Sequence, residues 1–176
     1  MRKLIVGVAI SLDGFIEGPN GEYDWCFTDS DYGITDFLKR IDALMMGRKT
    51  YDMMQGQKEE YPFSKMKTYV FSNTLESVRK GSVLVRGDLQ EEVQAIKNSP
   101  GKDIWLFGGA TLTSALLNLH LVDEVWLSVH PILLGAGKPL FQDIEGRINL
   151  KLHESKTYAS GLVSLWYHLP KQETSS

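Results

Sequence analysis

Hydrophobic and polar positions follow two alternating patterns along the first two thirds of the chain. Short, nearly continuous apolar runs are typical of strands covered on both faces, and they predict strands over residues 4–10, 43–46, 67–72, 82–86 and 103–107. Apolar residues spaced three and four apart predict helices over residues 31–41, 48–54, 89–96 and 110–119. Strands that alternate with helices in this way predict an α/β fold on a mostly parallel sheet.

The last third of the chain has a different pattern. It predicts strands over residues 124–130, 150–158 and 162–169, with turns at 135–137 and 160–161 and no helix between them. These strands are expected to be antiparallel and to lie at one edge of a mixed sheet. No repeat or shift of composition divides the chain, so we expect one domain over residues 1–170 and a disordered polar tail over 171–176.

Composition narrows the class of protein. Apolar residues make up 43% of the 176 residues and charged residues 23%, as in ordinary globular domains. The formal net charge of −3 gives no overall basic field, so we expect no nucleic-acid or anionic-lipid partner. The single cysteine, Cys26, excludes an internal disulfide, and the four histidines are scattered without ligand spacing, so we expect no metal.

The first ten residues superficially suggest a secretory signal. Their apolar run is short and passes straight into Ser11 without a small-residue cleavage site. No stretch approaches the ~20 apolar residues that a membrane span requires. We therefore expect a soluble, cytoplasmic protein with no membrane partner.

Candidate chemistry gathers in the loops after the predicted strands, because open α/β sheets bind ligands beyond the carboxyl ends of their strands. Gly108 and Gly109 stand where a buried strand turns into a helix, so a phosphate could approach backbone N–H groups at the helix N-terminus. A plain tight turn explains the two glycines equally well. No G-x-G-x-x-G motif follows the first strand, so the usual dinucleotide fingerprint is absent.

A second strand-to-helix turn, at Gly47, carries two adjacent cations. Arg48 and Lys49 could engage a phosphate through charge-assisted bonds, although a solvated basic face is the commoner explanation of such a pair. Thr50 adds a hydroxyl group. After the next two strands, Ser72, Asn73 and Arg86 offer groups that could hold an adenosine 2′-phosphate.

These segments, in this order, resemble the dihydrofolate-reductase-like superfamily. The resemblance is carried by residues 8–16, Trp25, residues 46–51, residues 107–110 and the antiparallel strands at the end of the chain. The S-L-D-G-x-I opening at residues 11–16 and the segment 131–141 are more similar to the reductase domain of riboflavin biosynthesis and its stand-alone relatives. The resemblance implies a three-layer dihydrofolate-reductase-like fold with a mixed, mostly parallel sheet.

The resemblance also implies an activity and a set of site residues. The implied reaction is NADPH-dependent reduction of the ribosylamino group of a phosphorylated pyrimidinedione to a ribitylamino group. Ala9, Ile10 and Ile16 would flank the nicotinamide. The rest of the cofactor would lie against Gly47, Arg48, Lys49, Thr50, Ser72, Asn73, Arg86, Gly108, Gly109, Ala110 and Thr111. Ser11, Asp13, Gly14 and Trp25 would border the substrate, and members of this branch often pair, which implies a homodimer.

Some features depart from the resemblance. Dihydrofolate reductases carry a partly buried carboxylate on the first helix, whereas Asp31 and Asp36 here are expected to be surface or capping acids. Trp25 follows an aspartate instead of the proline found in those enzymes, so folate is a weaker candidate. The zinc motif of the deaminase partner is absent. Lys138, in a Gly-rich turn, could bind a substrate phosphate or could belong to a plain surface turn.

Three functions therefore stay open. The leading one is the riboflavin-type reductase, and the second is a dihydrofolate reductase or a reductase of another heterocycle. A nucleotide-binding module without catalysis is the third, because the loop contains one clear acid, Asp13, as a catalytic candidate and no obvious general acid beyond it.

Overall fold

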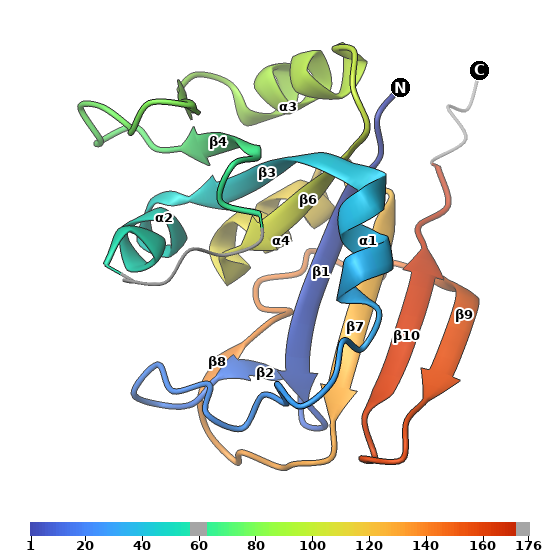
Figure 1. Cartoon of the computed structure of the whole chain (residues 1–176). Coiled ribbons are helices and arrows are strands. Elements are labelled where there is room, and N and C mark those ends of the chain that lie inside the picture. Colours follow the sequence, from blue (N-terminus) through green and yellow to red (C-terminus); the bar gives the residue numbers. More distant parts are fainter. Residues whose placement is uncertain (57–62, 172–176) are drawn as a thin grey trace.

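The computed structural model describes residues 1–56 and 63–171, which form a twisted sheet with helices on both faces (Figure 1). In chain order the elements are β1 (Leu4–Ser11), β2 (Phe15–Glu17), α1 (Ile34–Arg40), β3 (Ile41–Gly47), α2 (Arg48–Gln55), β4 (Lys67–Phe71), β5 (Ser82–Val85), α3 (Leu89–Asn98), β6 (Asp103–Gly108), α4 (Ala110–Asn118), β7 (Glu124–His130), β8 (Lys138–Pro139), β9 (Lys151–Thr157) and β10 (Val163–His168).

Within the described residues, eight strands form the main sheet in the order β5-β4-β3-β6-β1-β7-β10-β9. The strands from β5 to β7 run parallel, while β10 is antiparallel to β7 and β9 is antiparallel to β10. The predicted mixed sheet, mostly parallel with antiparallel strands at its C-terminal edge, is therefore confirmed. All carboxyl ends of the parallel strands meet at one edge, which is where a ligand is expected.

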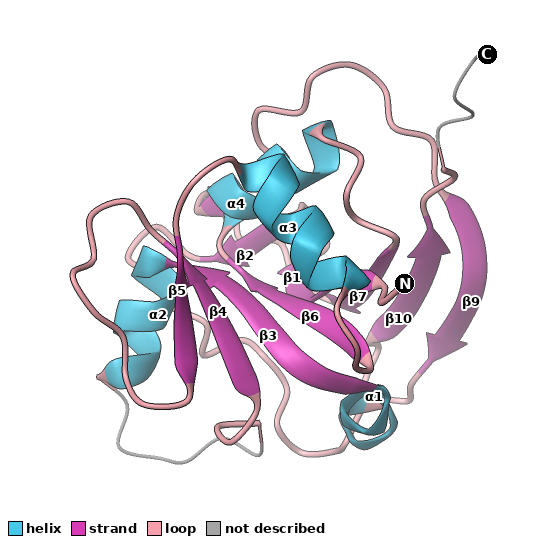
Figure 2. Cartoon of the chain, turned by 90° about the horizontal axis from the view of Figure 1, so that it is seen from above, coloured by secondary structure: helices cyan, strands magenta, loops and turns pink. Residues whose placement is uncertain are grey.

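The parallel strands are apolar on both sides because helices cover both faces. In β1, Leu4 and Val6 join a core cluster that includes Val93 of α3 and Leu116 of α4. Ile5 points to the other face and joins a second cluster with residues of α1 and α2. Figure 2 shows α3 and α4 on one face of the sheet and α1 and α2 on the other, which completes the three layers.

The structure contains two short strands, β2 and β8, in segments where the sequence predicted no strand. β2 and β8 pair antiparallel as a separate ribbon, with Phe15 opposite Pro139 and Glu17 opposite Lys138. Strands of three and two residues are too short to show a period of two in the sequence. The ribbon lies beside the carboxyl ends of β1 and β7 (Figure 1), so it belongs to the ligand-binding edge.

The first helix is shorter than its apolar spacing predicts. Asp31 accepts hydrogen bonds from the backbone N–H groups of Gly33 and Thr35, both at 3.1 Å, and so caps the helix from outside it. Ile41 already belongs to β3, where it is buried. The expectation that Asp31 is a capping acid is confirmed.

Of the predicted disordered tail, residues 171–176, only Lys171 lies within the described residues. The single domain over residues 1–170 stays a prediction. In the described part of the chain, no helix combines the length and the apolarity needed to cross a bilayer.

Candidate functional site

The turn between β6 and α4 gathers the predicted pyrophosphate residues. Gly109 is the N-cap of α4, no side chain caps this helix, and the Gly108-Gly109 peptide bond is cis. A Cβ atom on Gly109 would lie 3.4 Å from Thr50 Oγ1 and 4.0 Å from Lys138 Nζ. Among the described residues, the side chains of Thr50 and Lys138 have no hydrogen-bond or ion-pair partner. The Thr50 hydroxyl and the Lys138 ammonium group therefore both lie near the N-terminus of α4, whose first N–H groups have no partner within the helix.

A pocket of about 310 Å³ lies at the carboxyl ends of β4 and β5. It is lined by Phe71, Ser72, Asn73, Val85, Arg86, Gly87, Leu89 and Glu92. The structure thus brings together the residues predicted to hold the adenosine end of a cofactor. The pocket also contains the carboxylate-bearing residue Glu92, which the sequence did not point to.

The turn after β4 organises this pocket. Ser72 Oγ accepts hydrogen bonds from the N–H groups of Thr74 at 3.2 Å and Leu75 at 3.1 Å. Arg86 Nη2 donates to the carbonyl oxygen of Leu75, so its guanidinium group is held against the same turn. The side chain of Asn73 has no hydrogen-bond partner within the described residues and remains able to bind a ligand.

Arg48 links the start of α2 to the turn after β4. Its Nη1 donates to Thr74 Oγ1 at 2.7 Å, and its Nε lies 3.3 Å from Asp52 Oδ2. Gly47 provides the extended backbone that precedes α2, and Lys49 is exposed without an ionic partner in the described residues. Sequence reasoning missed Thr74, although a Ser-x-Thr segment directly after a buried strand was a usable signal.

Ser11, which is buried, and Asp13, which is exposed, link the opening loop to the segment before β8. Ser11 Oγ donates to Asp13 Oδ1 at 2.6 Å and accepts from the N–H of Phe15 at 2.9 Å. Asp13 accepts from the N–H groups of Leu134 at 3.1 Å and Gly135 at 2.8 Å. The Ser11 hydroxyl, together with these N–H groups, lowers the pKa of Asp13 below its usual value.

An ionised carboxylate has no proton to donate, so this geometry disfavours Asp13 as a general acid. Asp13 instead positions the loop that precedes β8. Gly14 contributes to the same link, because its carbonyl oxygen accepts from the N–H of Leu140 at 3.0 Å.

Trp25 lies against His130, a histidine that belongs to no motif recognised in the sequence. The two rings meet edge-on with centroids 5.3 Å apart. His130 is buried, its Nε2 accepts from the N–H of Phe27 at 3.1 Å, and its Nδ1 lies 2.9 Å from the carbonyl oxygen of Ser128. These contacts require the neutral ring with its proton on Nδ1. His130 therefore anchors the loop that carries Trp25.

The cysteine of this loop is not a nucleophile. Burial, with a further contribution from the charge of Asp24, raises the pKa of the Cys26 thiol to about 11. The thiol is therefore protonated near neutral pH, when the thiolate would be the reactive form.

The remaining predicted residues lie around the same edge of the sheet. Ile10 at the end of β1 and Ile16 in β2 pack into one core cluster, and Ala9 is half-buried beside them. Ala110 is buried in the first turn of α4. Thr111 is exposed and lies 3.5 Å from Gln142 Nε2 through its hydroxyl.

Comparison with known proteins decides the family. The model of the RibD C-terminal domain matches residues 2–164. This chain belongs to that family. The uncharacterized protein YyaP of Bacillus subtilis (strain 168) is 47% identical over 179 residues, which cover 95% of each chain.

Solved structures agree with this assignment. A Shewanella sp. PV-4 protein, whose name assigns it to riboflavin biosynthesis, has a TM-score of 0.86 at 30% identity over 96% of this chain and 99% of its own. A Thermotoga maritima deaminase/5-amino-6-(5-phosphoribosylamino)uracil reductase has a TM-score of 0.75 at 14% identity, with 96% of this chain matching 57% of that one.

The dihydrofolate reductase of Enterococcus faecalis, complexed with NADP(H) and RAB-propyl, has a TM-score of 0.69 at 18% identity over 96% of this chain and 97% of its own. Identities this low show the fold alone. These structures confirm the dihydrofolate-reductase-like fold expected from the sequence, and the match to the RibD C-terminal domain confirms the reductase-like family.

Proposed function

We propose that this RibD C-terminal domain family member is an NADPH-dependent reductase of the riboflavin-biosynthesis type. Its substrate would be a phosphorylated pyrimidinedione whose ribosylamino group is reduced to a ribitylamino group. The observation that carries the proposal is the set of unpartnered side-chain donors near Gly109, namely Thr50 and Lys138. They lie at the same edge of the sheet as the pocket at the carboxyl ends of β4 and β5. The family and its reductase relatives supply the reaction class.

The chemistry of these donors fits a dinucleotide. The space between Thr50, Gly109 and Lys138 suits a pyrophosphate, because glycine leaves room where a Cβ atom would stand. Asn73 and Arg86 suit the adenosine end, and Arg48 contacts Thr74 in the turn that organises this pocket. NADPH would supply a hydride, while the chain's own residues bind and orient it against the substrate.

Folate is disfavoured by the acids around the first helix. Asp36, the acid within α1, is 86% exposed and pairs with Lys39 at 2.8 Å, so it faces solvent. Asp31 is engaged in capping the helix. Neither resembles the partly buried carboxylate that a pteridine ring requires, which favours a pyrimidine over dihydrofolate.

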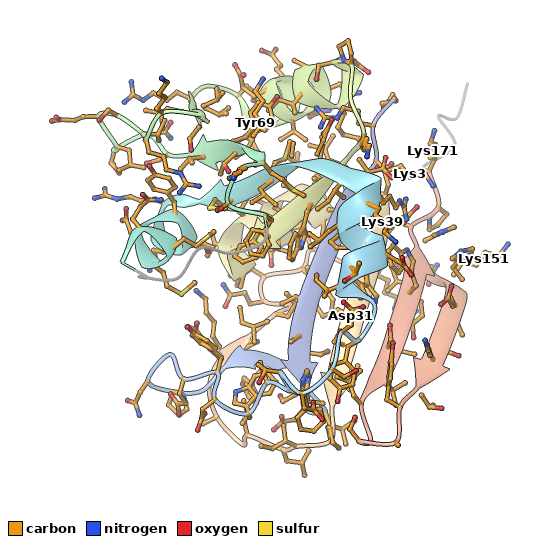
Figure 3. All side chains as sticks on the ribbon, viewed as in Figure 1. Lys3, Asp31, Lys39, Tyr69, Lys151 and Lys171 are labelled. Carbon is orange, nitrogen blue, oxygen red and sulfur yellow. The ribbon has the colours of Figure 1, made fainter. Side chains whose placement is uncertain are left out.

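The first experiment measures cofactor binding by tryptophan fluorescence. The double variant Arg48→Ala/Lys49→Ala should weaken NADPH by about 100-fold or more, since each of the two lost charge-assisted bonds is worth roughly 1.5–3 kcal/mol, and should leave NADH almost unchanged. The matched control Lys39→Ala/Lys151→Ala removes two cations far from this edge (Figure 3) and should bind like the wild type. Equal losses for NADPH and NADH would contradict a role at the 2′-phosphate.

The second experiment identifies the substrate. The protein is incubated with NADPH and either the pyrimidinedione riboside phosphate or dihydrofolate, and cofactor oxidation is followed by absorbance. Oxidation with the pyrimidinedione supports the proposal, and oxidation with dihydrofolate alone overturns its substrate. If the protein binds NADPH tightly but oxidises it with neither substrate, the result would favour the third function, a nucleotide-binding module without catalysis.

The antiparallel end of the sheet supports a homodimer as part of the proposal. All seven residues of β9 are exposed. On the α4 side, an apolar groove of about 220 Å³ is lined by Leu117, Val125, Phe141, Ile144, Ile148 and Leu150. A second copy of the chain would cover these apolar side chains, and size-exclusion chromatography coupled to light scattering measures whether it does.

A further inference from the structure

Lys138 is held in place by the ribbon that the sequence did not predict. It is the first residue of β8 and lies opposite Glu17 of β2. At Gly137, whose φ is +147°, a Cβ atom would stand 2.1 Å from the carbonyl oxygen of Glu17. A glycine is therefore needed for β8 to lie this close to β2, and the backbone of the lysine is fixed directly beside it.

Two further links fix the segment on either side of Lys138. Before it, Asp13 accepts the N–H groups of Leu134 and Gly135. After it, the N–H of Leu140 donates to the carbonyl oxygen of Gly14. A lysine whose backbone is held at both ends loses less freedom on binding a ligand than one on a mobile loop.

The ammonium group of Lys138 is directed to an unusual place. Its Nζ lies 4.0 Å from the Cβ position of Gly109, at the N-terminus of α4. That helix end carries partial positive charge, and the first turn of α4 contains no acidic residue. Arg48 and Lys49 lie in the first turn of α2, at the same edge of the sheet, whereas Lys39, Arg40 and Lys97 lie in the last turns of α1 and α3, where cations are favourable.

A cation beside a helix N-terminus is unfavourable unless an anion lies between them. Lys138 is half-buried and, within the described residues, has no carboxylate partner, not even Glu17 opposite it. A compact anion bound here would contact the ammonium group, the Thr50 hydroxyl and the helix N–H groups, and it would make this arrangement of positive charges favourable.

We infer that Lys138 binds the pyrophosphate of the cofactor, an inference that rests on the proposed NADPH site. This differs from the sequence-based expectation of a substrate phosphate, because Nζ lies beside Gly109, the residue predicted to meet the pyrophosphate, whose Cβ position is also 3.4 Å from Thr50 Oγ1. Pyrophosphate is common to NADPH and NADH. Lys138 thus contributes affinity for both cofactors, whereas Arg48 and Lys49 distinguish between them.

The test uses Lys138→Met, which keeps the apolar stem and removes the charge. Dissociation constants for NADPH, NADH and 2′-AMP are measured by calorimetry on the whole chain. We expect NADPH and NADH to weaken by a similar factor of about 10–100. Binding of 2′-AMP, which has the 2′-phosphate but no pyrophosphate, should stay within about twofold of the wild type. Lys151→Met on exposed β9 is the matched control.

The outcomes separate this inference from the proposed function. Wild-type binding of NADPH with unchanged affinity in Lys138→Met overturns the inference and leaves the proposed function standing. A variant that binds NADPH normally but has a raised KM for the phosphorylated pyrimidinedione assigns the lysine to the substrate and also overturns it. A wild-type chain that binds neither NADPH nor NADH overturns both.

Discussion

The two ends of the parallel sheet differ in how their charged side chains are paired. At the amino end, Glu124 is 1% exposed and is bound by Lys3 at 2.7 Å and by Arg40 at 2.8 Å. Trp166 Nε1 donates to the same carboxylate at 2.8 Å. Lys3 is labelled in Figure 3, at the end of β1 far from the ribbon of β2 and β8.

Other charged side chains at the amino end also form ion pairs. Arg2 pairs with Asp42, and Lys97 pairs with Asp123 at 2.7 Å. At the carboxyl end, Lys49 and Lys138 have no such partner among residues 1–56 and 63–171. The helices that begin there, α2 and α4, have no acidic residue in their first turns.

This difference separates charges that stabilise the fold from charges available to a ligand. Burial alone would raise the pKa of Glu124, but hydrogen bonds from Arg40, Lys3 and Trp166 hold it at about 2. Its ionic partners are supplied by the chain itself. At the carboxyl end, Lys49 and Lys138 have no carboxylate partner among the described residues, and Arg48 pairs with the exposed Asp52 of its own helix, so these cations remain accessible to a phosphate.

Breaking the amino end should have the largest effect. Glu124→Gln leaves Arg40 and Lys3 without their buried carboxylate, so we expect the free energy of unfolding to fall by about 3–5 kcal/mol. Urea denaturation measures the change. Asp36→Asn, which breaks the solvent-exposed pair with Lys39, should leave the free energy of unfolding almost unchanged. A similar loss in both variants would remove the distinction drawn for the amino end.

Acid should weaken the amino end in a defined interval. Folding lowers the pKa of Glu124 from 4.5 to about 2, so its stabilisation is complete above pH 4.5 and is lost as the pH falls through 2. The shift corresponds to on the order of 3 kcal/mol. Urea unfolding at a series of pH values should show this loss in the wild type. The curve of Glu124→Gln should lack it, and an identical slope in both proteins would exclude Glu124 as the cause.

The smallest expected effect is the coupling between the two ends. β1, with its eight residues from Leu4 to Ser11, separates them by roughly 25 Å. Glu124→Gln should therefore change NADPH affinity by less than about twofold at a pH where it stays folded. The double variant with Lys138→Met should be additive within ~0.5 kcal/mol. A larger coupling energy would mean that the ends do not act separately.

The sequence predicted what periodicity and local chemistry determine. Long apolar runs predicted the strands of the main sheet, and apolar spacing predicted the helix over residues 89–96, which the structure shows as α3 with Asp88 as its cap, accepting from the N–H of Glu91 at 2.9 Å. The glycine turns at Gly47 and Gly108 were found because strand, glycine and helix follow one another directly in the sequence.

Contacts between distant segments could not be predicted in this way. The bond from Lys3 to Glu124 joins residues 121 positions apart, and each of the two looks like an ordinary surface charge in the sequence. Lys138 reaches Gly109 only because β8 pairs with β2, a ribbon too short to have a detectable pattern. His130 is a lone histidine whose partner is a backbone N–H, which leaves no signature at all.

The position of Trp25 beside His130 also makes it an intrinsic fluorescence probe of the loop. Of its four tryptophans, Trp105, Trp126 and Trp166 pack within one interior cluster, where their surroundings are set by the fold. Trp25 is half-buried on the loop anchored by His130. A change in emission when a ligand is added will therefore arise chiefly from this indole, and its spectrum records the environment of the loop without an attached dye.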